Sequence, residues 1–341
     1  MKTLTISSVI LCFTILLNAC FEKEQPIAPY NSSITGVLFT IQQSIYTNQL
    51  FYSFESNKIV GSIPNTAWDL KFESSPQGWH IRVNSSNFIE IYPTDTTNFQ
   101  SNFTANKYKK ISNIEWNFDK SNGNPDSTAV GNWVNTSTNP YIYTGMVYLV
   151  GQWSGTSSFP LKKMIFTMVN DTSYRFIYAN LNGNDSTVVT IRKDTSCNYS
   201  YFSIAKGSQV IIEPKRFTWD ILFSQYVASL PDNGVFVPYP VRGVLLNPNQ
   251  VMVALDSVHS YTSISLQDIS NFQFTSVSDF IGYNWKSVTI NFAANTGTYS
   301  LRPNYTYLIQ DVLGNYYKLK FLSFYNSQGL EGYPAFEIMK L

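Results

Sequence analysis

One aromatic, turn-containing segment occurs twice in this chain, and this repeat limits the possible folds more than any other feature. The first copy is Phe51–Phe72, FYSFESNKIVGSIPNTAWDLKF, and the second is Tyr201–Phe223, YFSIAKGSQVIIEPKRFTWDILF. Their opening aromatic residues are 150 residues apart, and their Trp-Asp dipeptides are 151 apart. A period of this length corresponds to a domain and not to a solenoid repeat. The sequence therefore predicts two related domains in tandem.

Each copy is expected to form a β-hairpin, in which an aromatic strand and a polar turn lead to a strand that closes on Trp-Asp. Alternation of large apolar and smaller residues over Phe217–Phe223 indicates a strand with one apolar face. Only 13% of the residues are charged, and Asn, Ser, Thr and Tyr supply the polar surface, which favours strands and turns. The predicted fold class is all-β, with two tandem, mostly antiparallel β domains at residues 33–193 and 194–341 and few or no long helices.

The N-terminal segment is typical of an exported protein. Lys2 precedes the apolar run Leu4–Leu17, which has the length of a signal-peptide core. The run ends in Leu-Asn-Ala-Cys20, which resembles a bacterial lipobox. We therefore predict a lipoprotein signal peptide over residues 1–19, a lipidated Cys20 and a tether over residues 20–32. An ordinary secretory signal that contains Cys20 is the alternative.

This N-terminus also predicts where the protein resides. The charged residues directly after Cys20 resemble the surface-export signal of Bacteroidetes-type lipoproteins. We expect attachment to the outer membrane through the N-terminal lipid only, with the protein facing the cell exterior, or facing the periplasm as the alternative. With Cys12 removed and Cys20 lipidated, Cys197 has no disulfide partner, and we expect it to be a buried structural thiol.

Charge and motif content argue against two classes of function. The net charge is +1 without a basic run, which disfavours nucleic-acid binding. The chain has two histidines and lacks the G-x-S-x-G, H-E-x-x-H, C-x-x-C and P-loop motifs. Asp69 and Asp220, one in each repeat, are expected to bind turn amides. The turn Asp119–Asp126 resembles a calcium loop but lacks its closing Glu, so a plain turn is expected. No catalytic residues are predicted, and the protein is expected not to be an enzyme.

Several motifs together resemble one family. The matching residues are Tyr52–Phe54, Ser56, Val60 and Trp68–Phe72, followed near the end by Gly314–Phe321, Ser323 and Tyr325. Together with the lipobox, they resemble the HmuY family, haem-binding lipoproteins of the Bacteroidetes outer surface. The chain is similar to two tandem, diverged copies of that family.

The resemblance implies a mostly antiparallel β fold with long finger-like hairpins, between which haem is held by two axial His or Met side chains. His80 and His259 are thereby the candidate haem ligands. Met146, Met164, Met168 and Met252 are further possible donors, of which Met164 and Met168 are expected to pack in the core. At the repeat offset His259 corresponds to Lys107, so two symmetric haem sites are not expected.

Three functions remain open at this point. The first is a surface-anchored lipoprotein that captures haem or another small hydrophobic ligand. The second is a glycan- or protein-binding surface module, for which Trp79, Trp153, Tyr239 and Tyr283 are candidate contact residues because they lie near turns. The third is a non-catalytic scaffold at the cell surface.

Overall fold

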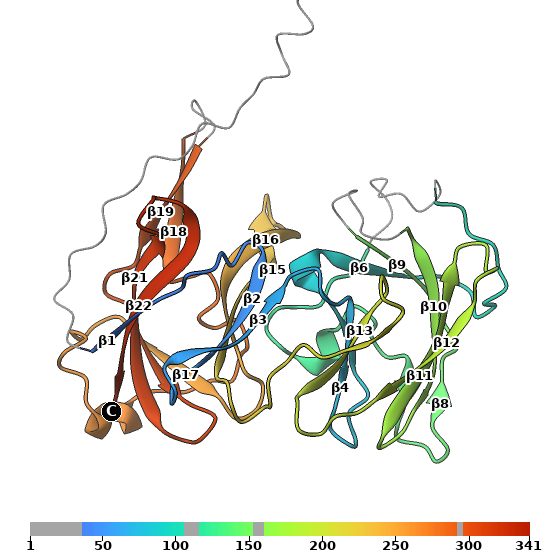
Figure 1. Ribbon diagram of the computed structural model, residues 1–341, viewed down its shortest axis with the longest axis horizontal. Coiled ribbons are helices and arrows are strands. Elements are labelled where there is room, and N and C mark those ends of the chain that lie inside the picture. Colours follow the sequence, from blue (N-terminus) through green and yellow to red (C-terminus); the bar gives the residue numbers. More distant parts are fainter. Residues whose placement is uncertain (1–35, 106–115, 153–159, 292–295) are drawn as a thin grey trace, which may run out of the picture.

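Two β-sheet units lie side by side along the long axis of the molecule (Figure 1). The structure is a computed structural model, and it describes residues 36–105, 116–152, 160–291 and 296–341. The predicted signal peptide, Cys20, the tether and Trp153 fall outside the described residues. The described part is built almost entirely of antiparallel strands, so the all-β prediction is confirmed.

The two units contain equivalent sets of strands. The first unit consists of β4 (Leu70–Glu73), β5 (Ile81–Val83), β6 (Ile89–Pro93), β7 (Val134–Asn135), β8 (Ile142–Tyr143), β9 (Val147–Gln152), β10 (Lys162–Val169), β11 (Ser173–Asn180), β12 (Thr187–Arg192), β13 (Tyr199–Ser203) and β14 (Ser208–Val210). The second unit consists of β1 (Val37–Thr40), β2 (Asn48–Ser53), β3 (Lys58–Pro64), β15 (Ile221–Asp232), β16 (Val235–Leu246), β17 (Met252–Asp256), β18 (Lys286–Asn291), β19 (Thr296–Leu301), β20 (Thr306–Gln310), β21 (Tyr316–Tyr325) and β22 (Glu331–Lys340).

Strand order is the same in both units. The five-stranded sheets run β12-β11-β10-β9-β6 in the first unit and β1-β22-β21-β20-β17 in the second. The four-stranded sheets run β14-β13-β4-β5 and β16-β15-β2-β3. Each position in one list therefore corresponds to a position in the other, as expected for two diverged copies.

The aromatic hairpins are exchanged between the repeats. The hairpin β2–β3 of the first repeat pairs with β15 of the second, with Tyr52 opposite Ile221. The hairpin β13–β14 of the second repeat pairs with β4 of the first, with Phe202 opposite Leu70. The expectation that each Trp-Asp strand closes its own hairpin is therefore wrong. Because the two hairpins have similar patterns, either can pair with either Trp-Asp strand, and local sequence does not distinguish the two arrangements.

This exchange separates the sequence repeats from the packing units. Strands β1–β3 belong to the first repeat in sequence, but Leu50, Tyr52 and Phe54 are buried in the core of the second unit. Conversely, Phe202 and Ile204 of the second repeat are buried in the core of the first unit. The predicted division between residues 193 and 194 stays a prediction about the repeats, whereas each packing unit contains strands from both.

Asp69 and Asp220 hold the exchanged hairpins in place. The Oδ2 atom of Asp69 accepts a hydrogen bond from the Ile204 amide at 2.7 Å, and that of Asp220 accepts one from the Phe54 amide at 2.7 Å. Asp220 also accepts from the Val312 amide at 2.9 Å. Burial raises the pKa of each carboxyl group to about 6. The prediction that both bind turn amides is confirmed.

Each unit has a tryptophan at the centre of its core. Trp133 and Trp285 are each 1% exposed. The Trp133 ring lies 5.5 Å from the Phe166 ring, and the Trp285 ring lies 4.0 Å from the Phe321 ring. Phe166 and Phe321 lie on the equivalent strands β10 and β21, and the tryptophans directly precede the equivalent strands β7 and β18, so the core follows the sequence repeat.

The helical elements that the structure describes in full are short. They are the 3-10 helices η1 (Ser85–Asn87), η2 (Pro125–Ser127) and η3 (Leu266–Asn271). Over the same ranges, the chain forms no helix of the length and apolar character needed to cross a bilayer.

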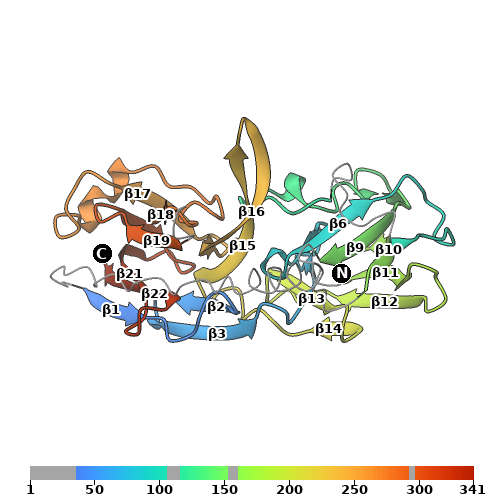
Figure 2. The ribbon, with the colours of Figure 1, turned by 90° about the horizontal axis from the view of Figure 1, so that it is seen from above.

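The second unit carries the longer hairpins. Strands β15 and β16 have 12 residues each, whereas their counterparts β4 and β5 have 4 and 3. The β15–β16 hairpin projects from the body of the molecule in Figure 2. Strands β18 and β19 have 6 residues each, against 2 each in β7 and β8. We call β15–β16 and β18–β19 the two fingers.

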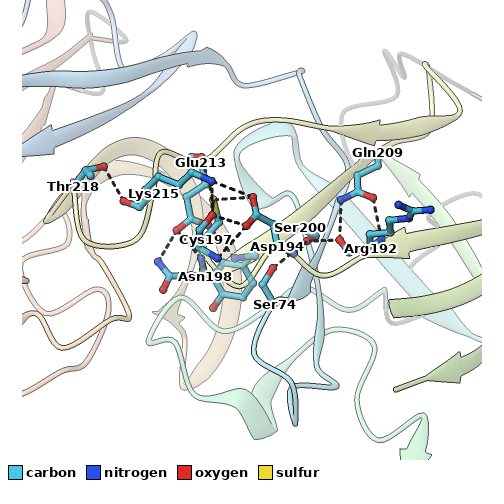
Figure 3. A network of polar contacts seen from close by, with 12 residues as sticks. Ser74, Arg192, Asp194, Cys197, Asn198, Ser200, Gln209, Glu213, Lys215 and Thr218 are labelled. Atoms are coloured by element: carbon cyan, nitrogen blue, oxygen red, sulfur yellow. Dashed lines mark hydrogen bonds and ion pairs between the residues drawn. The ribbon is translucent and has the colours of Figure 1, made fainter. Parts of the chain in front are cut away.

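A polar network fixes the segment that connects the units (Figure 3). The carboxylate of Glu213 accepts hydrogen bonds from the Asn198 and Tyr199 amides at 3.2 and 3.0 Å. The Asn198 side chain also donates to Asn247 Oδ1 of the second unit at 2.9 Å. Cys197 lies in this network, is buried and contacts the Glu213 carbonyl through its sulfur, which confirms the predicted structural thiol.

Candidate ligand-binding site

His80 lies in the short loop between β4 and β5 of the first unit. Its Nδ1 atom is 2.7 Å from Glu73 Oε2, and its ring stacks on Trp79 with a centroid separation of 3.8 Å. Burial works to raise the pKa of Glu73, but the contacts with His80 outweigh it, and the pKa is lowered. The Nε2 atom of His80 is buried and has no hydrogen-bond partner within the described structure.

In many metal-bound histidines one ring nitrogen is hydrogen-bonded to a carboxylate and the other binds the metal. However, His80 lines none of the three cavities described below. Trp79 is only partly exposed, packs against the core of the first unit and accepts a hydrogen bond from Trp133 Nε1 at 2.9 Å. Access to His80 Nε2 would therefore require Trp79 or the surrounding loop to move.

His259 lies in the second unit, directly after β17. Its Nδ1 atom is 3.0 Å from Asp256 Oδ2, and 63% of its side chain is exposed. The same aspartate accepts hydrogen bonds from the Val258 and His259 amides, which makes this a stabilised turn. His80 and His259 thus belong to different units, and their role as haem ligands stays a prediction.

The other predicted donors are largely structural. Met164 is fully buried in the core of the first unit, as expected, and Met146 packs against the same core. Met168 and Met252 are partly buried. The carboxylate of Asp119 accepts hydrogen bonds from the Val83 and Ala129 amides at 2.9 and 2.7 Å, which fits a structural turn. Within the described residues, His, Cys, Asp and Glu form no group of three or more that could hold a metal ion.

A cavity of about 530 Å³ lies between the two fingers. We call it the finger cavity. Its lining residues are Leu230, Tyr239, Pro240, Val241, Arg242, Tyr283, Asn284, Lys286, Ser287, Val288, Ile290, Gly297, Tyr299 and Arg302. Tyr239 and Tyr283, two of the aromatic residues predicted to contact a ligand, come together here. About half of the surface of Val288 and of Ile290 is exposed, so an apolar wall is available to a ligand.

A second cavity of about 680 Å³ adjoins the first. We call it the flanking cavity, and it shares Tyr283, Asn284 and Arg302 with the finger cavity. Its wall adds the aromatic residues Trp116 and Phe118 of the first unit, together with others of the second. The two cavities are therefore neighbours beside the β15–β16 finger, and both are rich in aromatic residues.

Lys286 gives the finger cavity an unusual electrostatic character. Its Nζ atom donates to the Arg242 carbonyl at 2.6 Å and lies 4.5 Å from the ring centres of both Trp285 and Phe324. Burial, with a contribution from the Arg242 charge, lowers the pKa of Lys286 to about 7. Near neutral pH the amine is partly uncharged, and an anionic group in the cavity would favour its charged form.

The chemistry of this cavity fits haem in part. Haem is a flat apolar ring with two carboxylates, and Arg242, Lys286 and Arg302 line the cavity with three basic groups that could pair with them. Neither His nor Met lines the cavity, but Tyr phenols do, and Tyr is an established axial ligand of haem iron. Tyr239, Tyr283 and Tyr299 line the cavity, and Tyr239 and Tyr283 are the two that we take as candidate iron ligands.

Sequence reasoning found the two tyrosines of this site but missed its basic residues. Of the three missed residues, Arg242 and Lys286 lie on the two fingers, and Arg302 directly follows β19. The sequence contains one signal of the longer finger. Equivalent positions of the two repeats are 151 residues apart at Leu70 and Ile221, but 163 residues apart at Val83 and Leu246. The difference corresponds to the lengthened β15–β16 finger.

Comparison with known proteins agrees with the repeat pattern. Residues 195–338 match the model of the HmuY protein family, which confirms the resemblance over the second repeat. No curated protein matches the chain.

Three solved structures are similar in part. A chain described as a HmuY-like heme binding protein of Bacteroides vulgatus has 11% identity and a TM-score of 0.23, over 92% of this chain and 97% of that one. A lipoprotein of Bacteroides fragilis has 15% identity and a TM-score of 0.23, over 52% and 88%. The apo HmuY analog of Tannerella forsythia has 9% identity and a TM-score of 0.22, over 90% and 96%. These scores are too low to support a functional conclusion.

Proposed function

We infer that this HmuY-like chain is a surface binding protein that captures a flat, amphipathic, anionic small molecule in the finger cavity, with haem as the first candidate. The observation that carries the proposal is the convergence of tyrosine rings, apolar side chains and three basic residues between the two fingers. Aromatic and aliphatic walls suit the faces of such a ligand, and Arg and Lys suit its carboxylates.

We also propose that the protein is attached to the membrane by a lipid. Cys20 would carry the lipid, and the chain would be anchored in the outer membrane facing the exterior, or the periplasm as the alternative. Capture of a ligand by an anchored protein requires binding and release, and we propose no catalytic step. The neighbouring finger and flanking cavities, both within the usual size range of ligand pockets, support a binding role.

Two sets of side chains are candidate iron ligands, and they lie in different places. Tyr239 and Tyr283 line the finger cavity, whereas His80 and His259 do not. If haem occupies the finger cavity, removal of a phenol oxygen should change its spectrum, and removal of either imidazole should not. If His80 holds the iron, the opposite result is expected.

The test is a hemin titration of the purified chain from Glu22 onward, followed by absorbance across the Soret region. A saturable, red-shifted band near one haem per chain is expected. Tyr239→Phe or Tyr283→Phe should shift the band, while His80→Ala and His259→Ala should leave it in place. A titration indistinguishable from free hemin would remove haem as the ligand. Loss of the band in His80→Ala alone would move the site to the first unit.

One observation favours a second candidate, an acidic glycan. Tyr239 is 55% exposed at the finger, and an exposed tyrosine beside arginines suits stacking against a sugar ring with a carboxylate. A glycan array would detect such binding, and Tyr239→Ala should abolish it. An array without hits would contradict the glycan candidate, and a positive hemin titration would then support the small-molecule proposal.

A further inference from the structure

A third cavity, of about 270 Å³, lies where the two units meet. We call it the junction cavity. It is lined from both units, by residues that include Trp68, Lys71, Arg82, Trp219 and Tyr226. Two other lining residues, Lys120 and Ser276, are exposed, so the cavity reaches the solvent. Apart from residues 119–121, its lining differs from that of the finger and flanking cavities.

Three buried polar atoms of this lining have no hydrogen-bond partner in the described structure. They are Arg82 Nε, Trp219 Nε1 and Tyr226 Oη, in residues that are 5%, 4% and 1% exposed. The equivalent tryptophan of the first repeat is satisfied, because Trp68 Nε1 donates to Gln49 Oε1 at 2.9 Å. A buried donor without an acceptor costs about 1–3 kcal/mol. An acceptor held in the cavity beside these groups would offset part of this cost.

The same cavity contains two basic side chains that face each other across a strand pair. Lys71 of β4 lies directly opposite Arg82 of β5. Like charges at directly opposed positions destabilise a sheet. The Lys71 ammonium lies 4.3 Å from the centre of the Tyr199 ring and has no hydrogen-bond acceptor among the described residues. It therefore remains available to a bound anion.

The carboxylates of Asp119 and Glu213 favour the charged form of Lys71 but do not pair with it directly. Both Asp119 oxygens already accept backbone amides, from Val83 and Ala129. The Glu213 carboxylate accepts the amides of Asn198 and Tyr199. Neither carboxylate lies within ion-pair distance of Lys71 or Arg82 in the described structure.

The junction cavity also has an apolar wall, which comes from the strands of the second repeat that are equivalent to β4 and β5. Lys71 and Arg82 are replaced at the equivalent positions of the second repeat by Leu222 and Leu245, which also lie directly opposite each other, across β15 and β16. Both leucines line the junction cavity. One wall is thus basic and the other apolar, although the two walls are equivalent strand pairs.

We propose that the junction cavity is a binding site for a small organic anion, a carboxylate on an apolar or aromatic body. The carboxylate would accept from Lys71 and Arg82, and the body would lie against Leu222, Leu245 and the Trp219 ring. The volume suits a molecule with one ring and is smaller than the usual pocket for a larger ligand. This proposal does not depend on haem binding in the finger cavity, with which the junction cavity shares no lining residue.

The test compares benzoate with benzyl alcohol, which has the same ring and no charge. Binding to the full mature chain is followed by intrinsic fluorescence, because Trp68 and Trp219 line the cavity, and by the thermal midpoint. Benzoate is expected to give a saturable change and to raise the midpoint, and benzyl alcohol should bind at least tenfold more weakly. Lys71→Leu, which installs the residue of the second repeat, should weaken benzoate binding at least tenfold.

The matched control is Lys206→Leu, the same substitution at an exposed lysine that does not line the cavity, which should change benzoate binding less than threefold. If Lys71→Leu fails to fold, as judged by circular dichroism, Lys71→Met replaces it. Absence of a saturable benzoate effect would overturn the proposal and would leave ordered water as the occupant. Equal binding of benzoate and benzyl alcohol, or benzoate binding unaffected by the Lys71 variants, would also overturn it.

Discussion

In the first unit the hairpin β4–β5 has strands of 4 and 3 residues, whereas its counterpart β15–β16 in the second unit has two strands of 12. The buried anchors differ far less. Asp69 and Asp220 each accept a turn amide from an exchanged hairpin, and Trp133 and Trp285 fill equivalent core positions. The repeats have thus kept the residues that hold the sheets together and diverged in their hairpins, and the finger cavity forms where the hairpins are long.

The divergence also extends to single side chains. Directly after the core tryptophan, the first unit has the buried Val134, and the second has Lys286, which lines the finger cavity. Burying an amine costs stability unless its charge and hydrogen bonds are compensated. Val134 shows that the equivalent position of the first unit holds an apolar residue. At the junction the pattern is reversed, because the basic residues belong to the first unit and leucines to the second. Each unit therefore contributes basic groups to a different cavity.

The largest effect is expected from the shared anchors. Asp220→Ala should lower the free energy of unfolding by about 3–5 kcal/mol, because two buried amides, of Phe54 and Val312, lose a charged acceptor. Asp69→Ala should cost less, about 2–3 kcal/mol, since one backbone amide, of Ile204, is affected. Urea unfolding at pH 7 measures both. Losses below about 1 kcal/mol for both variants would contradict the anchoring role.

Shortening the finger should convert the second unit toward the first. Excision of residues 230–232 and 235–237 keeps the Asn233-Gly234 turn, whose φ angles of 48° and 83° suit a tight hairpin. We expect ligand affinity to fall at least tenfold, about 1.4 kcal/mol, because the excision removes Leu230 from the lining and shortens the finger by three residue pairs beside Tyr239. The free energy of unfolding should change by less than about 1 kcal/mol, since the tip is largely exposed. Unchanged affinity in the shortened chain would place the ligand elsewhere.

Lys286→Val should make the second unit resemble the first electrostatically. The folded-state pKa of Lys286 is lowered to about 7 from 10.5, so the unfolded state binds more protons between these values. The contribution of Lys286 to the free energy of unfolding of the native chain should therefore rise as pH increases from about 7 to about 10. The variant should be more stable by about 1–2 kcal/mol at pH 7 and should lack that rise. Urea unfolding at pH 7, 8.5 and 10 tests this, and an unchanged pH slope would contradict it.

Much of the framework could be predicted from the sequence. Alternating apolar residues located the strands, and the Trp-Asp repeat identified both anchors and their amide-binding role. The exchange of hairpins could not be predicted in this way. The Tyr52 hairpin and the Phe202 hairpin have the same local pattern, so periodicity does not show which one pairs with Leu70 and which with Ile221. That choice is made by the tertiary structure.

The site was predictable only in part. Tyr239 and Tyr283 were identified as exposed aromatic residues near turns, but their convergence depends on how far two hairpins project. Lys286 was not singled out from the sequence, because no local pattern shows that it is buried beside Trp285. The histidines drew attention through their rarity, yet the structure ties each of them to a neighbouring carboxylate, Glu73 or Asp256.

The most direct test of the account compares hemin binding in two matched variants. Val288→Glu places a negative charge on the apolar wall of the finger cavity, and Ile142→Glu places one on the corresponding short hairpin of the first unit. Val288 is 51% exposed and Ile142 is 59% exposed, so neither change should alter the free energy of unfolding by more than about 0.5 kcal/mol. We predict that Val288→Glu weakens hemin binding at least tenfold and that Ile142→Glu leaves it unchanged. Equal binding by both variants and the native chain would contradict the claim that the ligand lies between the fingers of the second unit.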